Sequence, residues 1–246
     1  LTEARMAMNA DEARCMLDAS LAKPSLVAQV VPSPITLFAD ATIQRLIFEG
    51  YLGQLLAVES RVRGGFLDSD SPMHWRQNRD LSGNNILALG IYYEAIMRWV
   101  GRATNVMVRA KTFTEQRLNE TGESQTIEVP EHIDIAADLD CGAQLHLQQS
   151  AITALLEDDA FYLFGGEGTL RLTGDRLYGA RRGDRYLTEI SIADGERGEW
   201  RVEDDFVAAI RGERSVMLTT FAEGVHYMEF TDAVARSILS GRLEAV

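Results

Sequence analysis

The stretch HIDIAADLDCGAQLHLQQSAI, residues 132–152, decides the fold class of this 246-residue chain. Apolar and polar residues alternate on both sides of DCGA (140–143), a pattern typical of two antiparallel strands joined by a tight turn. Similar short segments lie nearby in the sequence: ATNVMVRAKTFTEQ (103–116), AFYLFGG (160–166), GTLRLTG (168–174), RLYGARR (176–182) and YLTEISI (186–192). Together they predict a mostly antiparallel sheet.

Helical patterns lie before and after this run of strands. Apolar residues recur at helical spacing over 37–49, 81–101, 202–211 and 221–240. Consecutive strands flanked by helices are typical of an α+β fold, here an open sheet with helices on one face. We expect the other face of the sheet to be buried in a homodimer or homotetramer, because burial removes apolar area from water.

The helix LSGNNILALGIYYEAIMRWVG (81–101) contains a glycine at its centre. Gly90 would cost about 1 kcal/mol relative to alanine in a helix interior, so either another group approaches closely there or the glycine is incidental. Glu94 and Arg98, four residues apart, predict an ion pair. Apolar residues at helical spacing predict a buried stripe of Ile86, Leu89, Tyr93, Ile96 and Val100. Candidate helix caps are Ser82, Asn84 and Asn85.

The first part of the chain has a different character. Asn9 and Glu12 form a capping signal for a helix that extends to about residue 22 and ends before Pro24. SLVAQVV (25–31) is a continuous apolar run, as in a strand of a sheet buried on both faces. A helix followed by such a strand is half of a βαβ unit. We therefore predict two parts, residues 1–34 and residues 35–246.

Composition excludes several classes of protein. The net charge of −13 makes binding to the phosphates of nucleic acid unfavourable. No apolar run has the length of a membrane span, and the first residues do not resemble a secretory signal. Cys15 and Cys141 lack the spacing of a metal site, and no histidine or glutamate completes a metal shell around the aspartates of residues 134–140. We expect a cytoplasmic protein without a metal.

Several motifs, in this order, resemble those of the Gfo/Idh/MocA oxidoreductases, the family of glucose–fructose oxidoreductase and inositol dehydrogenase. The segments that carry the resemblance are DEARCMLDASLAKPSLVAQVV (11–31), ATIQRLIFEGYLGQLLAVESRV (41–62), WRQNRDLSG (75–83), FGGEGTLRL (164–172) and HYMEFTDAVARSILSGRLEAV (226–246). The resemblance implies a Rossmann domain that binds NAD or NADP, followed by an α+β domain. Residues 1–34 then resemble the end of the Rossmann domain.

The glycine-rich strand–turn–helix that holds a dinucleotide pyrophosphate is missing from the sequence, because FGGEGTL (164–170) lies between strands and opens no helix. The resemblance therefore implies that residues 35–246 form the substrate-binding and oligomerisation domain, and that the chain alone is inactive.

The family's catalytic motifs are only partly matched. ALGIY (88–92) is similar to the D-x-G-x-Y variant, in which Gly90 and Tyr92 match and the aspartate is replaced by Ala88. TEARMAM (2–8) is similar to the E-K-P segment, in which Glu3 matches, the lysine is replaced by Ala4 and Arg5 follows. The resemblance implies that Tyr92 takes part in proton transfer and that Glu3, Arg5 and Gly90 contact the cofactor. Alternatively, Tyr92 belongs to a packed core helix.

The polar loop GGFLDSDSPMHWRQNRDL (64–81) is a second candidate site. A sugar site needs an aromatic platform and several hydrogen-bonding groups, and the loop offers both in His74, Trp75, Arg76, Asn78 and Asp80. The alternative is a solvated loop anchored by its tryptophan.

Two functions follow from these observations. The first is an NAD(P)-dependent oxidoreductase that acts on a sugar or polyol-like alcohol, and this chain would mainly supply its substrate-binding and oligomerisation domain. The second is a non-catalytic ligand-binding or scaffold protein derived from such an enzyme, as the replacements at Ala4 and Ala88 and the missing nucleotide motif suggest.

Overall fold

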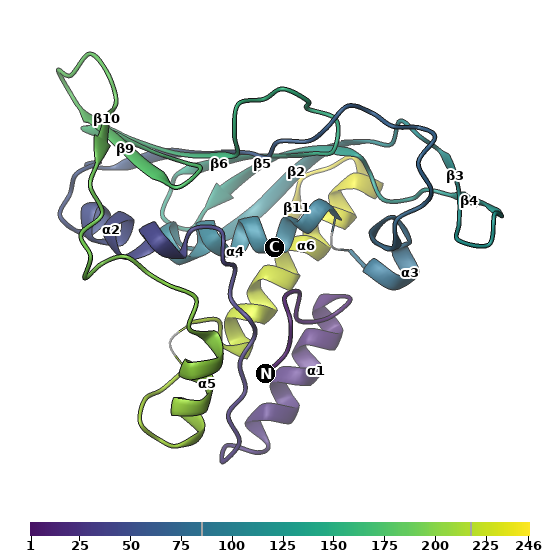
Figure 1. The fold of residues 1–246 in the computed structure, drawn as a ribbon, viewed down its shortest axis with the longest axis horizontal. Helices are drawn as coiled ribbons and strands as arrows, with labels where there is room; N and C mark the ends of the chain where they lie inside the picture. The colour runs from purple at the N-terminus through teal and green to yellow at the C-terminus, as the bar shows by residue number, and fades with distance from the viewer. Residues whose placement is uncertain (85, 217) are drawn as a thin grey trace.

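The central feature of the fold is a single nine-stranded sheet. The computed structural model describes residues 1–84, 86–216 and 218–246. The order of the strands is β10-β9-β8-β7-β1-β6-β5-β2-β11 (Figure 1). Their bounds are β1 Leu55–Arg61, β2 Ala103–Lys111, β5 His132–Leu139, β6 Gln144–Ser150, β7 Ala160–Gly165, β8 Gly168–Thr173, β9 Arg176–Arg181, β10 Thr188–Ile190 and β11 Glu244–Ala245. A separate hairpin consists of β3 Gln116–Leu118 and β4 Ser124–Thr126.

The predicted antiparallel sheet is confirmed. Only the pair β1 and β6 runs parallel among the neighbouring strands described, and every other pair is antiparallel. The β5–β6 hairpin turns at Gly142, whose φ of 87° favours glycine. Along β5, Ile133 and Ile135 are buried, whereas Ala136 and Asp138 are exposed. The strand therefore has one face in the core and one face outside it.

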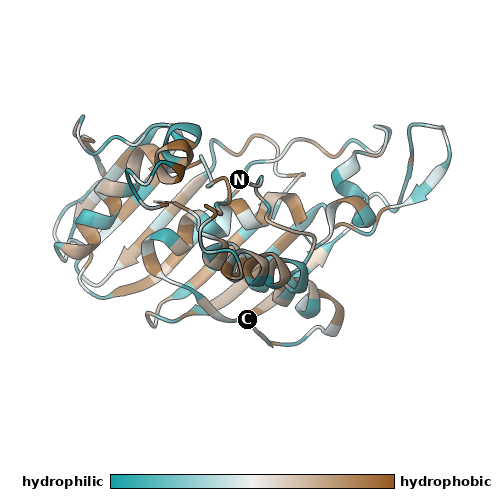
Figure 2. Cartoon of the chain, turned by 90° about the horizontal axis from the view of Figure 1, so that it is seen from below, coloured by the Kyte–Doolittle hydropathy of each residue, from teal (hydrophilic) through white to brown (hydrophobic). Residues whose placement is uncertain are grey.

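Helices cover one face of the sheet. The main ones are α2 Leu37–Phe48, α4 Leu89–Val100 and α6 Phe221–Ser240; they lie below the sheet in Figure 1, and Figure 2 shows them crossing in front of the strands. Tyr93 of α4 and Phe230 of α6 stack with ring centroids 3.6 Å apart, and both are fully buried. Among the described residues, none of the helices combines the length and apolar character that a bilayer crossing requires.

Further helices lie outside this layer. α1 Ala10–Leu21 packs against α6. In the sequence, α5 Val202–Ile210 follows β10 and precedes α6. The side chain of Asn9 caps α1 by accepting from the N–H of Glu12, as predicted. The predicted helices over 37–49, 202–211 and 221–240 are confirmed within one residue at each end.

The prediction of one continuous helix over 81–101 is wrong. The segment divides into the end of α3 Arg79–Ser82, a 3₁₀ turn Ile86–Ala88, and α4. The helix is interrupted because Leu87 and Ala88 have φ values of 48° and 61°, which are not helical. Gly90 is consequently the second residue of α4 and does not bear the cost of a glycine in a helix interior.

The buried stripe predicted for this segment is confirmed, whereas two of its candidate caps are not. The predicted stripe is buried throughout: Ile86, Leu89, Tyr93, Ile96 and Val100. Of the candidate caps, Asn85 lies outside the described residues. Neither Ser82 nor Asn84 caps α4, because the residue before that helix is Ala88, which has no capping side chain.

The strand predicted over 25–31 is also wrong. It reduces to a single parallel bridge between Val30 and Thr2, and Leu26 is exposed. A strand needs a neighbouring backbone along its length, and here Val30 donates its N–H to the carbonyl of Thr219. The structure therefore shows α1 and one bridge where a Rossmann helix and strand were expected. The division at residue 34 stays a prediction.

Candidate functional site

Tyr92 meets a carboxylate that comes from the sheet. Its hydroxyl donates a hydrogen bond of 2.5 Å to Oδ2 of Asp159, the residue directly before β7. The other carboxylate oxygen of Asp159 accepts from the backbone N–H of Arg63 at 2.6 Å. The Tyr92 ring stacks on Phe161 with ring centroids 6.0 Å apart and planes 24° apart. α4, β7 and the end of β1 thus converge on one carboxylate.

The electrostatics of this pair keep Tyr92 protonated. Burial raises the pKa of Tyr92 well above its ordinary value of about 10, and the hydrogen bond to Asp159 and the negative charge of that residue raise it further. At neutral pH the phenol is therefore a hydrogen-bond donor to Asp159. Tyr92 in this arrangement holds a carboxylate in place and cannot itself be the resting base.

A cavity of about 420 Å³ opens beside the pair. Its wall is lined by the polar residues Asp158, Asp159, Arg63 and Thr173, together with Ile35, Phe161, Leu172 and Gly174. A wall with several hydrogen-bonding residues is suited to a polar organic ligand. Sequence reasoning missed Asp159 and Arg63, although Asp159 directly precedes the predicted strand 160–166 and strand ends often carry ligand-binding residues.

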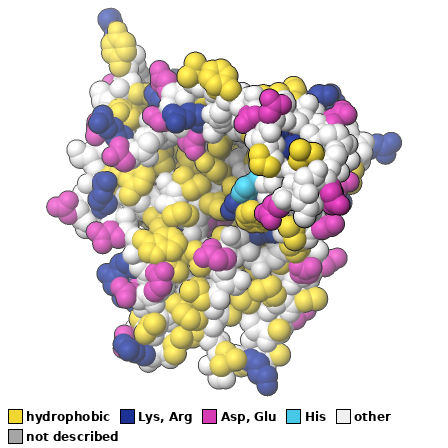
Figure 3. Space-filling view, turned by 45° about the vertical axis from the view of Figure 1, so that its right-hand side comes forward, with side chains coloured by type: hydrophobic (Ala, Val, Ile, Leu, Met, Phe, Trp, Pro, Cys, Tyr) yellow, Lys and Arg dark blue, Asp and Glu magenta, His cyan; other side chains and the backbone are white. Residues whose placement is uncertain are grey.

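Residues of the polar loop 64–81 line a second, separate cavity. His74, Trp75 and Asn78 line a space of about 310 Å³ together with residues 119–121 of the β3–β4 hairpin. The guanidinium of Arg76 lies 4.3 Å from the centre of the Trp75 ring. In the space-filling view of Figure 3, hydrophobic side chains gather around a hollow on the face that is turned forward.

Polar side chains of this loop accept hydrogen bonds from backbone N–H groups of the same loop. The ring of His74 caps the short helix Trp75–Gln77, and Asn78 accepts from the N–H of Asp80 at the start of α3. Of the five predicted substrate-binding residues, the structure brings His74, Trp75 and Asn78 to one cavity. It does not bring them to the cavity beside Tyr92, and Arg76 and Asp80 are not part of the wall described for either cavity.

Of the three predicted cofactor residues, only Gly90 shares the helix of Tyr92. Glu3 is exposed, and Gly90 is buried in the first turn of α4. Arg5 donates to the carbonyl of Leu81 at 3.1 Å, so it lies beside the loop. Burial lowers the pKa of Arg5, and the charge of nearby Arg76 lowers it further against the opposing effects of Tyr227 and Glu12. Within the described part of the chain, no hydrogen bond or ion pair joins Arg5 to Tyr92.

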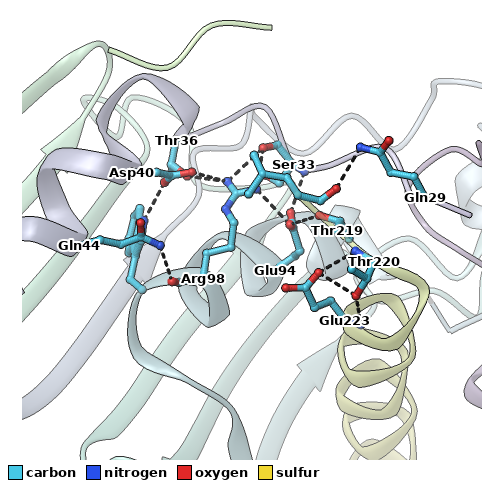
Figure 4. A network of polar contacts seen from close by, with 12 residues as sticks. Gln29, Ser33, Thr36, Asp40, Gln44, Glu94, Arg98, Thr219, Thr220 and Glu223 are labelled. Atoms are coloured by element: carbon cyan, nitrogen blue, oxygen red, sulfur yellow. Dashed lines mark hydrogen bonds and ion pairs between the residues drawn. The ribbon is translucent and has the colours of Figure 1, made fainter. Parts of the chain in front are cut away.

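A buried polar network fixes the helix that carries Tyr92 (Figure 4). Arg98 of α4 pairs with Glu94 and with Asp40 of α2, each at 3.0 Å. Glu94 also accepts from the N–H of Ser33 at 2.7 Å and from the hydroxyl of Thr219 at 2.6 Å. The predicted ion pair of Glu94 and Arg98 is confirmed. Burial raises the pKa of Glu94, although Arg98 and its hydrogen bonds oppose this.

The glycine-rich segment 164–170 does not form a dinucleotide cradle. Gly165 and Gly168 belong to β7 and β8, and a Cβ on either glycine would clash with the backbone of residues 51–52. These glycines therefore permit close packing within the protein and do not open a helix toward a phosphate. This segment therefore does not fit the pyrophosphate of a nicotinamide cofactor.

Comparison with solved structures shows the same fold in several oxidoreductases. An oxidoreductase domain protein from Kribbella flavida superposes with a TM-score of 0.87 at 17% identity, over 100% of this chain and 74% of that one. An NAD binding oxidoreductase from Klebsiella pneumoniae gives 0.83 at 20% identity over 99% and 72%. Levoglucosan dehydrogenase in complex with NADH and levoglucosan gives 0.85 at 20% identity, again over 99% and 72%.

Comparison of sequences identifies the family. No curated protein matches the chain. The family model described as the GFO/IDH/MocA C-terminal domain matches residues 41–171, more than half of the chain and most of the sheet. The order of strands and helices agrees with the resemblance seen in the sequence motifs. The chain therefore belongs to the GFO/IDH/MocA oxidoreductase family.

Proposed function

We propose that this chain is the substrate-binding and oligomerisation part of an NAD(P)-dependent oxidoreductase that acts on a sugar or polyol-like alcohol. The observation that supports the proposal most strongly is the family match over residues 41–171. The cavity beside Asp159 adds a place where an alcohol could bind. Levoglucosan dehydrogenase, which shares the fold, is described with NADH and a sugar derivative.

The cofactor proposal is NAD or NADP, without a choice between them. When bound, a nicotinamide cofactor exchanges a hydride with its substrate. The glycine-rich segment 164–170 does not fit a pyrophosphate, so the part proposed for this chain is to bind and orient the alcohol. The test is to titrate the natural polypeptide that carries this sequence with NADH and NADPH and to follow nicotinamide fluorescence. Failure of both to bind at millimolar concentration would refute the proposal.

A non-catalytic ligand-binding or scaffold protein is the second candidate. The observations that favour it are Ala4 and Ala88, which stand where the family motifs have a lysine and an aspartate, and the protonated state of Tyr92. The variant Tyr92→Phe tests part of the difference between the oxidoreductase and the non-catalytic protein. Unchanged turnover in that variant would show that Tyr92 is not the proton acceptor, and no turnover of any polyol by the natural polypeptide would favour the second candidate.

Assembly through the open face of the sheet is part of the proposal. No described helix covers this face (Figure 1), and Met107 is 48% exposed there beside a hollow of about 470 Å³ that Ala136 and His146 also line. Apolar surface of this kind is stabilised by burial in an interface. We infer a homodimer or homotetramer, and sedimentation as a strict monomer at micromolar concentration would contradict it.

A further inference from the structure

The position of Asp159 answers a question that the sequence leaves open. ALGIY (88–92) keeps the tyrosine of the family motif but has Ala88 in place of the carboxylate, so the motif gives Tyr92 no charged partner within its own helix. In the structure Asp159, which lies 67 residues away in the sequence, accepts a hydrogen bond from the hydroxyl of Tyr92. The site therefore contains a carboxylate after all.

We propose that Asp159 is the hydroxyl-binding residue of a site for neutral polyols in the 420 Å³ cavity, with Tyr92 as the positioning residue that holds its carboxylate. This inference rests on the proposed function for the class of ligand. It goes further by assigning the ligand to this cavity, and not to the cavity of His74 and Trp75, and by naming the residue that recognises it.

Asp159 is fixed with little freedom to turn. Its Oδ2 accepts from Tyr92 and its Oδ1 accepts from the N–H of Arg63, while its own carbonyl accepts from the hydroxyl of Thr173 at 3.0 Å. Each carboxylate oxygen can accept more than one hydrogen bond, so Asp159 keeps capacity for a further donor in the cavity that it lines. A preorganised charged acceptor loses little entropy when a hydroxyl binds to it.

Tyr92 is suited to hold the carboxylate and not to replace it. The Tyr92 ring stacks on Phe161, and its hydroxyl donates a hydrogen bond to Asp159. The raised pKa of the phenol keeps that proton in place at neutral pH. Tyr92 is not among the residues that line the cavity, whereas Asp159 is.

The charges of the cavity select against anionic ligands. Asp158 and Asp159 both line it, and Arg63 is the one cation described in its wall. The guanidinium of Arg63 donates to the carbonyl of Glu157 at 3.0 Å and lies 3.9 Å from Asp158, so it is directed at protein groups. A sugar carboxylate or phosphate would meet two carboxylates, whereas neutral hydroxyls would find acceptors.

The binding test uses myo-inositol, D-glucose and D-glucuronate as probes with the natural polypeptide, in titration calorimetry without cofactor. We expect a neutral probe to bind more tightly than D-glucuronate. Asp159→Asn removes the charge of the acceptor and should weaken neutral binding by about 10-fold or more. Asp158→Asn removes the neighbouring carboxylate of the same wall, which has no hydrogen bond to Tyr92, and should weaken neutral binding less than Asp159→Asn does. Trp75→Ala in the other cavity is the control and should leave neutral binding unchanged.

A spectroscopic readout tests the role of Tyr92. A short hydrogen bond to a carboxylate is expected to give a downfield proton resonance, present in the wild type and in Asp158→Asn but absent from Tyr92→Phe and Asp159→Asn. Circular dichroism shows whether each variant is folded. Tyr92→Phe should weaken neutral binding less than Asp159→Asn, because Asp159 keeps its charge.

Three outcomes overturn the inference: no neutral probe binds, Asp159→Asn binds as tightly as the wild type, or Trp75→Ala alone abolishes binding. The proposed function fails separately. If neutral binding depends on Asp159 but NADH and NADPH do not bind, the enzyme proposal fails and the site remains. If a nicotinamide cofactor binds while Asp159→Asn has no effect on the alcohol, only this inference fails.

Discussion

Replacing Arg98 by methionine should destabilise the protein strongly. The side chain of Arg98 is 7% exposed and pairs with the carboxylates of Glu94 and Asp40, each at 3.0 Å. It also donates to the carbonyl of Ser33 and the hydroxyl of Thr36. Methionine fills similar space but leaves two carboxylates without their cation. Loss of one partner from a buried ion pair costs about 3–5 kcal/mol, a large part of a total stability of about 5–15 kcal/mol.

The measurement is urea unfolding followed by circular dichroism at fixed protein concentration, at pH 7. With a slope of about 2–3 kcal/mol per molar, a loss of this size lowers the midpoint by about 1–2 M. Arg45→Met is the matched control, because Arg45 makes comparable ion pairs with Glu49 and Glu196 at the surface, and it should change the midpoint much less. If Arg98→Met loses less than about 1 kcal/mol of unfolding free energy, the buried pairing of Arg98 with Glu94 and Asp40 does not stabilise the fold.

Three other changes have defined outcomes. Gly83→Ala should lower the free energy of unfolding by at least about 1–2 kcal/mol in urea, since Gly83 has a φ of 58° and a Cβ there would clash with a backbone carbonyl just before α1. Burial alone would raise the pKa of Glu131, yet hydrogen bonds from two backbone N–H groups and from Arg117 lower it. Ionised Glu131 therefore stabilises the fold above the ordinary pKa of about 4.3, and this is lost as pH falls through the lower folded value. Glu131→Gln should lower the melting temperature at pH 7 and flatten that acid-side loss; an unchanged pH profile would contradict this. Tyr93→Phe should cost about 1–3 kcal/mol, because it leaves the buried N–H of Ala103 without its 2.7 Å acceptor, and wild-type stability in this variant would contradict it.

The sheet could be predicted because its signal is local. Residues 132–152 alternate between apolar and polar positions, and each strand has one face in the core. The buried stripe of α4 is local in the same way. The break before α4 could not be predicted, because it depends on positive φ values at Leu87 and Ala88. Positive φ values are usually indicated by glycine or asparagine, and neither residue occupies these two positions. The strand expected over 25–31 failed because an apolar run does not reveal whether a partner backbone lies beside it.

The candidate site was only half visible in the sequence. Tyr92 stood out through a short motif, but its partner Asp159 comes from the start of β7 and lies 67 residues away. No periodicity connects these positions; only the pairing of β1 with β7, which places Arg63 and Asp159 side by side, brings the parts together. The loop residues 74–80 were predicted from their chemistry, and the structure shows that two of them, His74 and Asn78, already cap short helices.

The two adjacent tyrosines of α4 have different surroundings because of helix geometry. Successive side chains on an α-helix point about 100° apart, so Tyr93 enters the core while Tyr92 faces the end of the sheet. Tyr93 is fully buried, stacks on Phe230 and accepts the N–H of Ala103. These contacts fix the rotation of α4 about its own axis. That rotation in turn places the hydroxyl of Tyr92 on Asp159, so the packing of one tyrosine determines the position of the other, and a loss of packing at Tyr93 should also displace the candidate site.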